Sequence, residues 1–308
     1  MFLNLTPESI RQNFSSQGYI ADDTIISTVF NALAINSPIL VDGPAGVGKT
    51  ELAKTIARML SANMIRLQCY SGIGVNEVLY EMDASKIQSY TTMLDQHVKN
   101  IVHGKTWEEA VKTIETKKFF SSEDFLIKRP VLQAIDPDDN RFQLLLIDEI
   151  DKADEKIEAM LLEVLSDYSV SVPELGRTYH ARPDMKPFVI LTSNNVRELG
   201  EPLRRRCSYL YIDYPSIEVE QRIIHMKSQV PFDYAYDAAC LMKDIRENVS
   251  MKKLPSNSES INFFHVMYHC YGLQKIDKSV YGNVLAQGVS LLAKYQSDNE
   301  ALTKYFLK

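Results

Sequence analysis

The stretch GPAGVGKT at residues 43–50 decides the fold of this chain. It has the pattern G-x-x-x-x-G-K-[ST], and it lies between the apolar run PILV at 38–41 and a segment, 49–60, with apolar residues at helical spacing. Glycines let backbone N–H groups turn toward phosphate oxygens, and a helix that starts at the end of the loop adds its dipole. The order strand, glycine loop and helix therefore predicts a phosphate-binding loop, or P-loop.

The residue types in this loop predict a site for ATP and Mg²⁺. Lys49 is expected to reach the β and γ phosphates, and the hydroxyl of Thr50 to coordinate the Mg²⁺ ion. The expected cofactor-binding residues are the eight residues of the loop and the one that follows: Gly43, Pro44, Ala45, Gly46, Val47, Gly48, Lys49, Thr50 and Glu51.

Four further apolar runs are bounded by polar or turn residues, as buried parallel strands are: 64–67, 142–147, 188–191 and 209–212. After the run at 142–147, apolar residues repeat at helical spacing in a stripe made of Ile157, Met160, Leu161, Val164 and Leu165. Five strands interleaved with helices predict a doubly wound α/β sheet of the P-loop NTPase type. We expect the 188–191 strand to lie between the P-loop strand and the 142–147 strand.

The strand pattern ends at Tyr214-Pro215, and the remaining sequence has helical spacing only, for example on the face Val284, Gly288, Leu291, Leu292 and Tyr295. The sequence therefore predicts two domains. Residues 1–214 form the α/β nucleotide-binding domain, and residues 215–308 form a small all-helical lid domain. A polar stretch at about 84–128 has no strand pattern and predicts a helical insertion in the first domain.

Two acidic residues follow the apolar run in LLLIDEIDKA, residues 144–153. The strand brings Asp148 and Glu149 to its C-terminal edge, where ligands bind in open α/β sheets. Asp148 is expected to bind Mg²⁺, and Glu149 to orient or deprotonate the attacking water. The alternative is that these acids cap the next helix, but the P-loop about a hundred residues upstream favours the catalytic interpretation.

Two polar clusters near the end of the α/β region are further candidates. Asn194 ends the 188–191 run and could hold the lytic water or sense the γ-phosphate; its alternative is a turn or cap residue. Arg205 and Arg206 lie in LRRRC at 203–207, where an arginine could be offered to the ATP of a neighbouring subunit. Their alternative is a solvated charged surface.

Composition limits the possible partners and surroundings. The net charge of −6 and the pI near 5.6 argue against a surface that neutralises nucleic-acid phosphates. No apolar stretch approaches the length of a membrane span and the N-terminus has no signal-peptide pattern, so we expect a cytoplasmic protein. The four cysteines form no CxxC pair and are expected to be ordinary buried thiols. The six histidines give no ligand-spaced pair on a recognised element, so no transition-metal site is expected.

The chain resembles the AAA+ ATPases of the MoxR group, and within it most closely the CoxD-like members. The resemblance extends beyond the nucleotide motifs and is carried by GPAGVGKTELAK (43–54), IRLQCYSGIGVNEVLYE (65–81), FLIKRPVLQAI (125–135), LLLIDEIDKADEKIEAMLLEVLSDY (144–168), VPELG (172–176) and LTSNNVRELGEPLRRRCSYLYIDYP (191–215).

The resemblance implies an AAA+ core with a helical lid, assembled into a homo-oligomer, a hexameric ring, with ATP at the subunit interfaces. It also implies a chaperone-like role in maturing a metal cofactor in a client metalloenzyme, together with a von Willebrand factor A domain partner. By motif match, Lys49 and Thr50 belong to Walker A, Asp148 and Glu149 to Walker B, Asn194 to sensor 1, and Arg205 to the arginine finger. A helix-2 insert is implied around residues 69–73 and a hairpin at 170–182.

Two features of this resemblance leave alternatives open. Tyr19 and Ile20 lie where the family wraps the adenine, but a packing role explains them equally well. The lid arginine called sensor 2 has no counterpart in PSNSESINFF at 255–264, so Arg222 or Arg246 would have to replace it, or sensing would rely on the neighbour's arginines.

Two other functions share these nucleotide residues. A nucleic-acid motor or clamp loader would need the same loop, although the acidic composition argues against it. A scaffold that binds ATP without hydrolysing it would need neither Glu149 nor the arginine run, and both are present.

Overall fold

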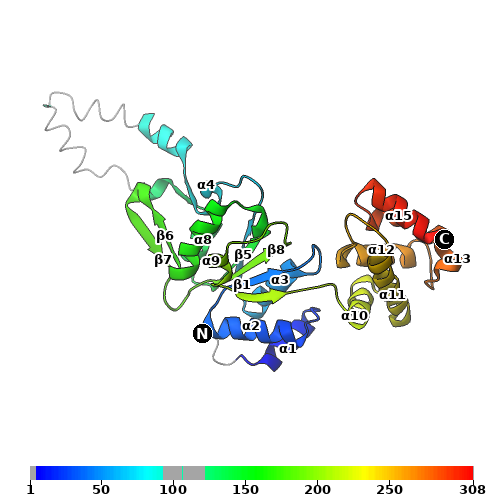
Figure 1. Ribbon diagram of the computed structural model, residues 1–308. Helices are drawn as coiled ribbons and strands as arrows, with labels where there is room; N and C mark the ends of the chain where they lie inside the picture. Colours follow the sequence, from blue (N-terminus) through cyan, green and yellow to red (C-terminus); the bar gives the residue numbers. More distant parts are fainter. Residues whose placement is uncertain (1–4, 93–105, 107–121, 308) are drawn as a thin grey trace. The chain divides into compact units, whose positions relative to one another are not determined.

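The five predicted strands form one parallel sheet in this computed structural model, which describes residues 5–92, 106 and 122–307 (Figure 1). The sheet has the order β2-β5-β8-β1-β9, so the prediction that the fourth strand lies between the P-loop strand and the acidic strand is confirmed. In the parallel register of β2 and β5, Gln68 is the partner of Asp148. The strands are β1 (Ile39–Asp42), β2 (Asn63–Gln68), β5 (Gln143–Asp148), β8 (Phe188–Ser193) and β9 (Ser208–Tyr211).

The chain divides into two compact units. The first comprises Ser61–Leu191 and Leu199–Cys207, and the second comprises the chain up to Leu60, Thr192–Glu198 and the chain from Ser208 onward. Because this division runs through the sheet, the domain boundary expected near residue 214 stays a prediction.

In the first unit, α7 (Pro130–Ile135) packs on β2 and β5, and α8 (Glu155–Asp167) packs on β6 and on α9 (Glu201–Arg204). Asp154 caps α8 by accepting a hydrogen bond from the backbone N–H of Ile157. The apolar stripe predicted for this helix is buried at Ile157, Leu161, Val164 and Leu165, and Met160 is half-buried. The short elements of this unit are α4 (Val75–Val78), η1 (Ser122–Phe125), η2 (Ile150–Lys152) and η3 (Pro173–Leu175).

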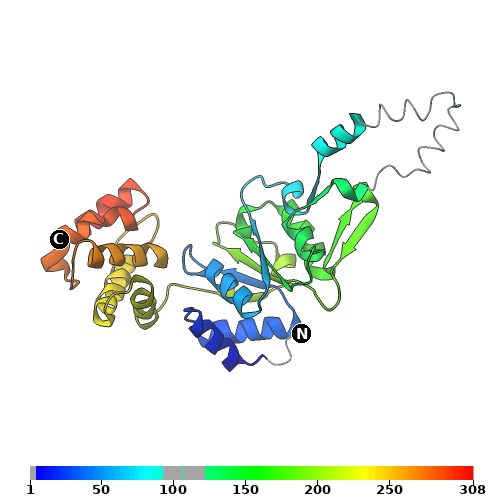
Figure 2. The same cartoon turned by 180° about the vertical axis from the view of Figure 1, so that it is seen from behind.

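Two antiparallel strand pairs accompany the sheet in the first unit: β3 (Tyr80–Met82) with β4 (Leu126–Lys128), and β6 (Ser169–Val172) with β7 (Arg177–His180). The second pair is the hairpin that the family resemblance implied at 170–182. The first pair corrects the prediction that 84–128 lacks a strand, since β4 occupies its end. Residues 84–92 form an exposed helix directed away from β3 (Figures 1 and 2), while 93–105 and 107–121 of that insertion lie outside the described residues.

The second unit joins the P-loop strand to the N-terminal helices. α1 (Pro7–Ser16) lies against α2 (Asp23–Ile35) and α3 (Lys49–Met59), and α2 lies against β9 (Figure 1). Thr6 and Asp22 cap α1 and α2 with their side-chain oxygens.

From residue 217 onward the described chain is helical, as predicted. Its helices are α10 (Ile217–Ser228), α11 (Phe232–Asn248), α12 (Asn257–His269), α13 (Lys278–Gln287), α14 (Val289–Leu292) and α15 (Gln296–Phe306). Their core includes the buried side chains of Phe263, Phe264, Met267 and Leu302. Gly288 separates α13 from α14, so the single face expected over 284–295 is interrupted.

Within residues 5–92 and 122–307, no helix combines the length and the apolar character needed to cross a membrane.

Candidate nucleotide site

The glycines of the P-loop adopt backbone conformations that a residue with a side chain would rarely take. Gly43, Gly46 and Gly48 have φ values of 149°, 79° and 108°. A Cβ atom at Gly43 would lie 1.9 Å from the carbonyl oxygen of Ile212, so the loop can leave β1 only where this position is glycine. The sequence prediction of a strand, a turned loop and a helix beginning at Lys49 is therefore realised locally.

Lys49 lies inside this loop and is 6% exposed. Its Nζ atom donates hydrogen bonds to the carbonyl oxygens of Gly43 at 2.6 Å and Pro44 at 2.8 Å, and to Oδ1 of Asn194 at 2.8 Å. An ammonium group removed from water must be compensated by such partners. The lysine of the loop and the amide that follows β8 are thus brought together.

Tyr19 lies next to the end of the P-loop. A Cβ atom at Gly48 would be 4.0 Å from the ring carbon Cε2 of Tyr19, and the ring makes an edge-to-face contact with Phe14. Burial, followed by the charges of Asp22 and Glu51, raises the pKa of the Tyr19 hydroxyl above its usual value. Ile20 is half-buried. These contacts fit packing, and an adenine contact for either residue stays a prediction.

The acidic pair lies at the C-terminal end of β5 in the first unit. Asp148 is the last residue of the strand and is 3% exposed. Glu149 follows with φ 59° and ψ 48°, in the left-handed region that residues with side chains usually avoid. This turn of the backbone starts η2 and directs the chain out of the sheet immediately after the strand.

Side chains of β2 bind both acids. Arg66 donates to Oδ2 of Asp148 through Nε at 3.0 Å and through Nη2 at 2.5 Å. Gln68 donates from Nε2 to Oε2 of Glu149 at 2.8 Å. Arg66 and Gln68 lie two residues apart on one strand and therefore point to the same side.

Lys152 contributes a second cation at Glu149. Its Nζ atom lies 2.6 Å from Oε2 of Glu149, and this hydrogen bond raises the pKa of the lysine. Because the Lys152 side chain is exposed and the Glu149 side chain is partly exposed to solvent, the pair adds little to stability. Its effect is on the orientation of the Glu149 carboxylate.

The arginines of LRRRC lie at the end of α9. The guanidinium of Arg205 forms an ion pair with Glu201 one helical turn away, and its side chain is 76% exposed. Arg206 donates to Oγ of Ser166 at 2.6 Å and to the carbonyl oxygen of Pro202 at 3.1 Å. Among the residues that the structure describes, Glu201 is thus the side-chain partner of Arg205, and the exposed guanidinium is accessible to another molecule.

The family model for an AAA domain of the dynein-related subfamily matches residues 38–207, which is more than half of the chain. The chain belongs to this family. It is an AAA ATPase, and the matched region contains the P-loop, both acidic residues, Asn194 and the arginine run.

Relatives of this AAA ATPase include uncharacterized staphylococcal proteins. One from Staphylococcus saprophyticus is 26% identical over 219 residues, covering 69% of each chain, and one from Staphylococcus aureus is 25% identical over 215 residues, covering 67% of this chain and 68% of its own. A solved structure of a mutant RuvB from Thermotoga maritima aligns with a TM-score of 0.46 at 15% identity, over 96% of this chain and 72% of that one. A likeness at this level carries no weight for function.

Three residues at the acidic pair of the AAA ATPase were not anticipated from sequence: Arg66, Gln68 and Lys152. Lys152 lies in the acidic stretch 144–153, and a strand was expected at 64–67, which contains Arg66 and ends one residue before Gln68. Its alternation of apolar and polar residues signals a strand with one polar side. The sequence does not show that this strand pairs with β5, the strand that ends in the acidic residues. That pairing comes from the sheet order.

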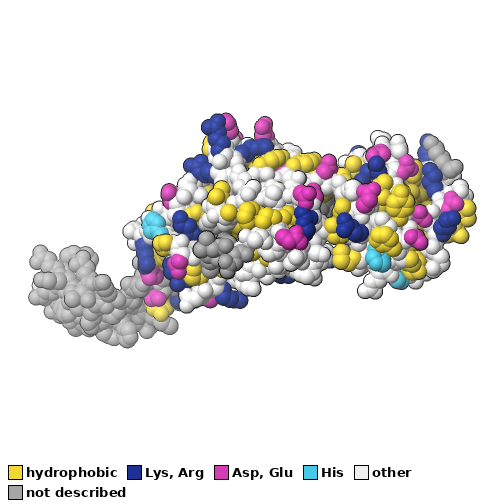
Figure 3. All heavy atoms as spheres, turned by 90° about the horizontal axis from the view of Figure 1, so that it is seen from below, with side chains coloured by type: hydrophobic (Ala, Val, Ile, Leu, Met, Phe, Trp, Pro, Cys, Tyr) yellow, Lys and Arg dark blue, Asp and Glu magenta, His cyan; other side chains and the backbone are white. Residues whose placement is uncertain are grey.

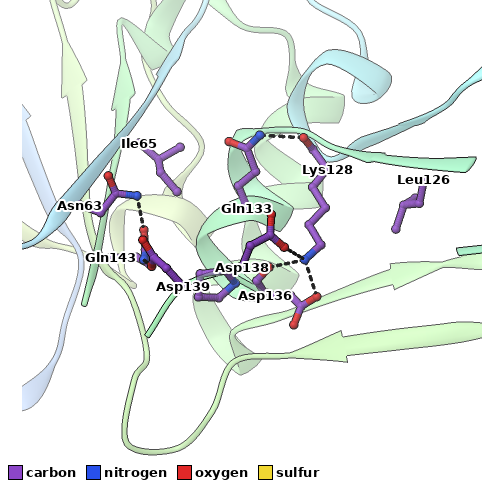
Figure 4. A pocket seen from close by; sticks show the side chains of 10 residues that line it. Asn63, Ile65, Leu126, Lys128, Gln133, Asp136, Asp138, Asp139 and Gln143 are labelled. Atoms are coloured by element: carbon purple, nitrogen blue, oxygen red, sulfur yellow. Dashed lines mark hydrogen bonds and ion pairs between the residues drawn. The ribbon is translucent and has the colours of Figure 1, made fainter. Parts of the chain in front are cut away.

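A separate cavity of about 500 Å³ in the first unit is not the nucleotide site of the AAA ATPase (Figure 4). It is lined by Asn63 and Gln143, the first residues of β2 and β5, whereas Asp148 ends β5. Lys128 in this cavity is paired with Asp136 and Asp138. The cavity therefore lies at the opposite ends of these strands from the acidic pair.

The helical region corrects one expectation about histidines. His265 and His269 are four residues apart on α12 and so form a pair at ligand spacing, contrary to expectation. A ring nitrogen of each contacts the carbonyl oxygen of Ser228, at 3.2 Å and 2.9 Å. Among the described residues, however, no group of three or more potential ligands could hold a metal ion.

Proposed function

We propose that this AAA ATPase binds Mg-ATP at its P-loop, hydrolyses it with the help of an arginine from a neighbouring copy, and uses the cycle to remodel a protein partner. The roles of the residues are those that the resemblance to the MoxR group implies for the matching motifs of this chain. Asn194 is assigned to the lytic water or the γ-phosphate, and Arg205, with Arg206 as the second candidate, to the ATP of the adjacent subunit.

The observation that carries the nucleotide part is the set of hydrogen bonds made by Lys49. One buried ammonium group binds two carbonyl oxygens of the P-loop and the side chain of Asn194. A γ-phosphate that accepted the hydrogen bonds of Lys49 in place of the carbonyl oxygens would also come within reach of Asn194. The arrangement supports a site at which phosphate binding and phosphate sensing share one cation.

The residues assigned to the metal fit Mg²⁺ by their chemistry. Thr50 offers a hydroxyl and Asp148 a carboxylate, which are the oxygen donors that this small, hard cation prefers. The carboxylate of Asp148 is buried at the end of its strand and is paired with the Arg66 guanidinium. When bound, Mg²⁺ would neutralise charge on the phosphate oxygens.

The remaining chemistry is assigned to side chains of the chain. Glu149 orients the attacking water and accepts its proton while the oxygen of that water bonds to the γ-phosphorus. The bond between the γ-phosphorus and the bridging oxygen breaks, and ADP leaves with the electron pair. Lys49 and an arginine in trans stabilise the charge on the transferring group.

A protein partner is favoured over nucleic acid. The net charge is −6, and on the face shown in Figure 3 the Lys and Arg side chains are interspersed with Asp and Glu instead of forming one basic patch. The group resemblance further suggests a hexameric ring, a von Willebrand factor A domain protein as partner and a client metalloenzyme that receives its metal. The cytoplasmic location expected from the sequence is also part of the proposal.

A substrate-trapping comparison tests this function. Glu149→Gln should hold ATP without turnover and retain its client, whereas Lys49→Ala should bind neither. Affinity capture from native lysate followed by mass spectrometry should enrich a von Willebrand factor A domain protein and a metalloenzyme with Glu149→Gln only. Equal recovery with both variants, or salt-dependent binding of single-stranded DNA by the wild-type chain, would contradict the proposal.

A further inference from the structure

Arg66 connects the two acidic residues of the candidate site. Its Nη2 atom donates both to Oδ2 of Asp148 and to Oε1 of Gln68, each at 2.5 Å. Because the Gln68 carbonyl oxygen faces Arg66, its amide nitrogen is turned toward Glu149, which it contacts at 2.8 Å. A continuous chain of hydrogen bonds thus runs from Asp148 through Arg66 and Gln68 to Glu149.

The charge on Arg66 conflicts with a metal ion at Asp148. A guanidinium within hydrogen-bond distance of a carboxylate neutralises it, and a divalent cation on the same carboxylate would repel the guanidinium. The Asp148 side chain is 5% exposed, but the Arg66 side chain is 49% exposed and has solvent into which it can swing. The cation can therefore displace the arginine, whereas the carboxylate is fixed at the strand end.

We propose that Arg66 is a positioning residue that holds Asp148 when no metal is bound and that Mg²⁺ must displace. The inference rests on the proposed Mg-ATP site and concerns its regulation. When Arg66 leaves Asp148, its hydrogen bond to Gln68 is lost as well, while Lys152 still binds Glu149.

The Mg²⁺ dependence of nucleotide binding tests the displacement. A fluorescent ADP analogue is titrated at fixed concentration with Mg²⁺ for the wild type, Arg66→Gln, Arg66→Lys and the control Arg141→Gln, which removes another exposed arginine of the same unit from its pair with Asp139. We expect the half-maximal Mg²⁺ concentration to fall about tenfold in Arg66→Gln, within the usual range of coupling between two sites. Arg66→Lys keeps the charge but lacks the planar guanidinium, so its half-maximal Mg²⁺ concentration should lie between those of the wild type and Arg66→Gln. The control Arg141→Gln should match the wild type.

Two different failures are distinguishable. If the wild type binds the analogue with a clear Mg²⁺ dependence and Arg66→Gln shows the same half-maximal concentration, or a higher one, Arg66 does not compete with the metal and this inference is overturned. If the wild type shows no Mg²⁺-dependent binding at all, the proposed function fails instead. Thermal melting shows whether each variant is folded. If Arg66→Gln does not fold, Arg66→Lys is compared with the wild type instead.

Discussion

Arg246 and Glu220 form a double ion pair between α11 and α10, with Nη1 2.7 Å from Oε2 and Nη2 2.8 Å from Oε1. Their side chains are only 7% and 2% exposed. Arg246 also donates to the carbonyl oxygen of Pro255 and lies over the ring of Tyr214. Of the two arginines considered as a replacement for sensor 2, Arg246 is thus committed to buried contacts in the helical region, and Arg222 is exposed on α10.

Removing one partner of this pair should destabilise the chain strongly. Arg246→Met leaves the Glu220 carboxylate buried without its cation, and such changes cost about 3–5 kcal/mol. We expect a lower urea midpoint by circular dichroism. The double variant Arg246→Met with Glu220→Leu should recover part of the loss, because no buried charge is left unpaired. A midpoint unchanged in Arg246→Met would show that the pair contributes nothing.

Lys49→Ala should abolish nucleotide binding, whereas Glu149→Gln should keep binding and lose turnover. The lysine is assigned to the phosphates and the glutamate only to the water, so the two variants separate affinity from chemistry. Titration with fluorescent ATP and phosphate release measure the two quantities. Phosphate release at the wild-type rate in Glu149→Gln would remove that residue from its assigned role.

Arg205→Ala should reduce turnover far more than ATP binding, because an arginine finger contributes about 10³-fold or more in related enzymes. If Arg205 acts in trans, mixing Arg205→Ala subunits with Lys49→Ala subunits should restore part of the activity. Some interfaces then join an intact P-loop to an intact arginine. Head-to-tail contacts of this kind close into rings. No recovery after verified subunit exchange would assign Arg205 to a surface charge only.

The cysteines should differ sharply in reactivity. Burial raises the pKa of the Cys69 and Cys207 thiols to about 12, so almost no thiolate is present at pH 8. Cys270 is exposed, contrary to the expectation that all four thiols are buried. Iodoacetamide at pH 8 should therefore label Cys270 and spare Cys69 and Cys207, as mass spectrometry can establish, and urea should make them react. Early labelling of Cys69 in the folded chain would contradict its burial.

The strands of the sheet could be predicted because each contains a short apolar run that is bounded by polar or turn residues. The P-loop and the acidic pair locate β1 and β5 directly, and the position of β8 between them follows from the family of sheets that such loops form. β3 and β4 could not be found, since each has three residues and shows no distinct alternation.

The helical region shows the limit of spacing arguments. Apolar residues continue at helical spacing through Gly288, yet the helix breaks there. A Cβ atom at Gly288 would lie 2.6 Å from Met267 and 2.7 Å from Phe263, so the glycine allows α12 to pack closely. Tyr295, expected on the buried face, is 51% exposed and precedes α15. Such long-range packing leaves no periodic trace in the sequence.

The left-handed backbone of Glu149 has a consequence for how this protein can be improved. A residue with a side chain in a sparsely populated conformation costs about 1–3 kcal/mol, and glycine would relieve much of it. Directed evolution for heat resistance alone would thus reward the loss of the very side chain assigned to the water. Screens of this chain for thermostability need a simultaneous selection for turnover, or they will enrich well-folded and inactive proteins.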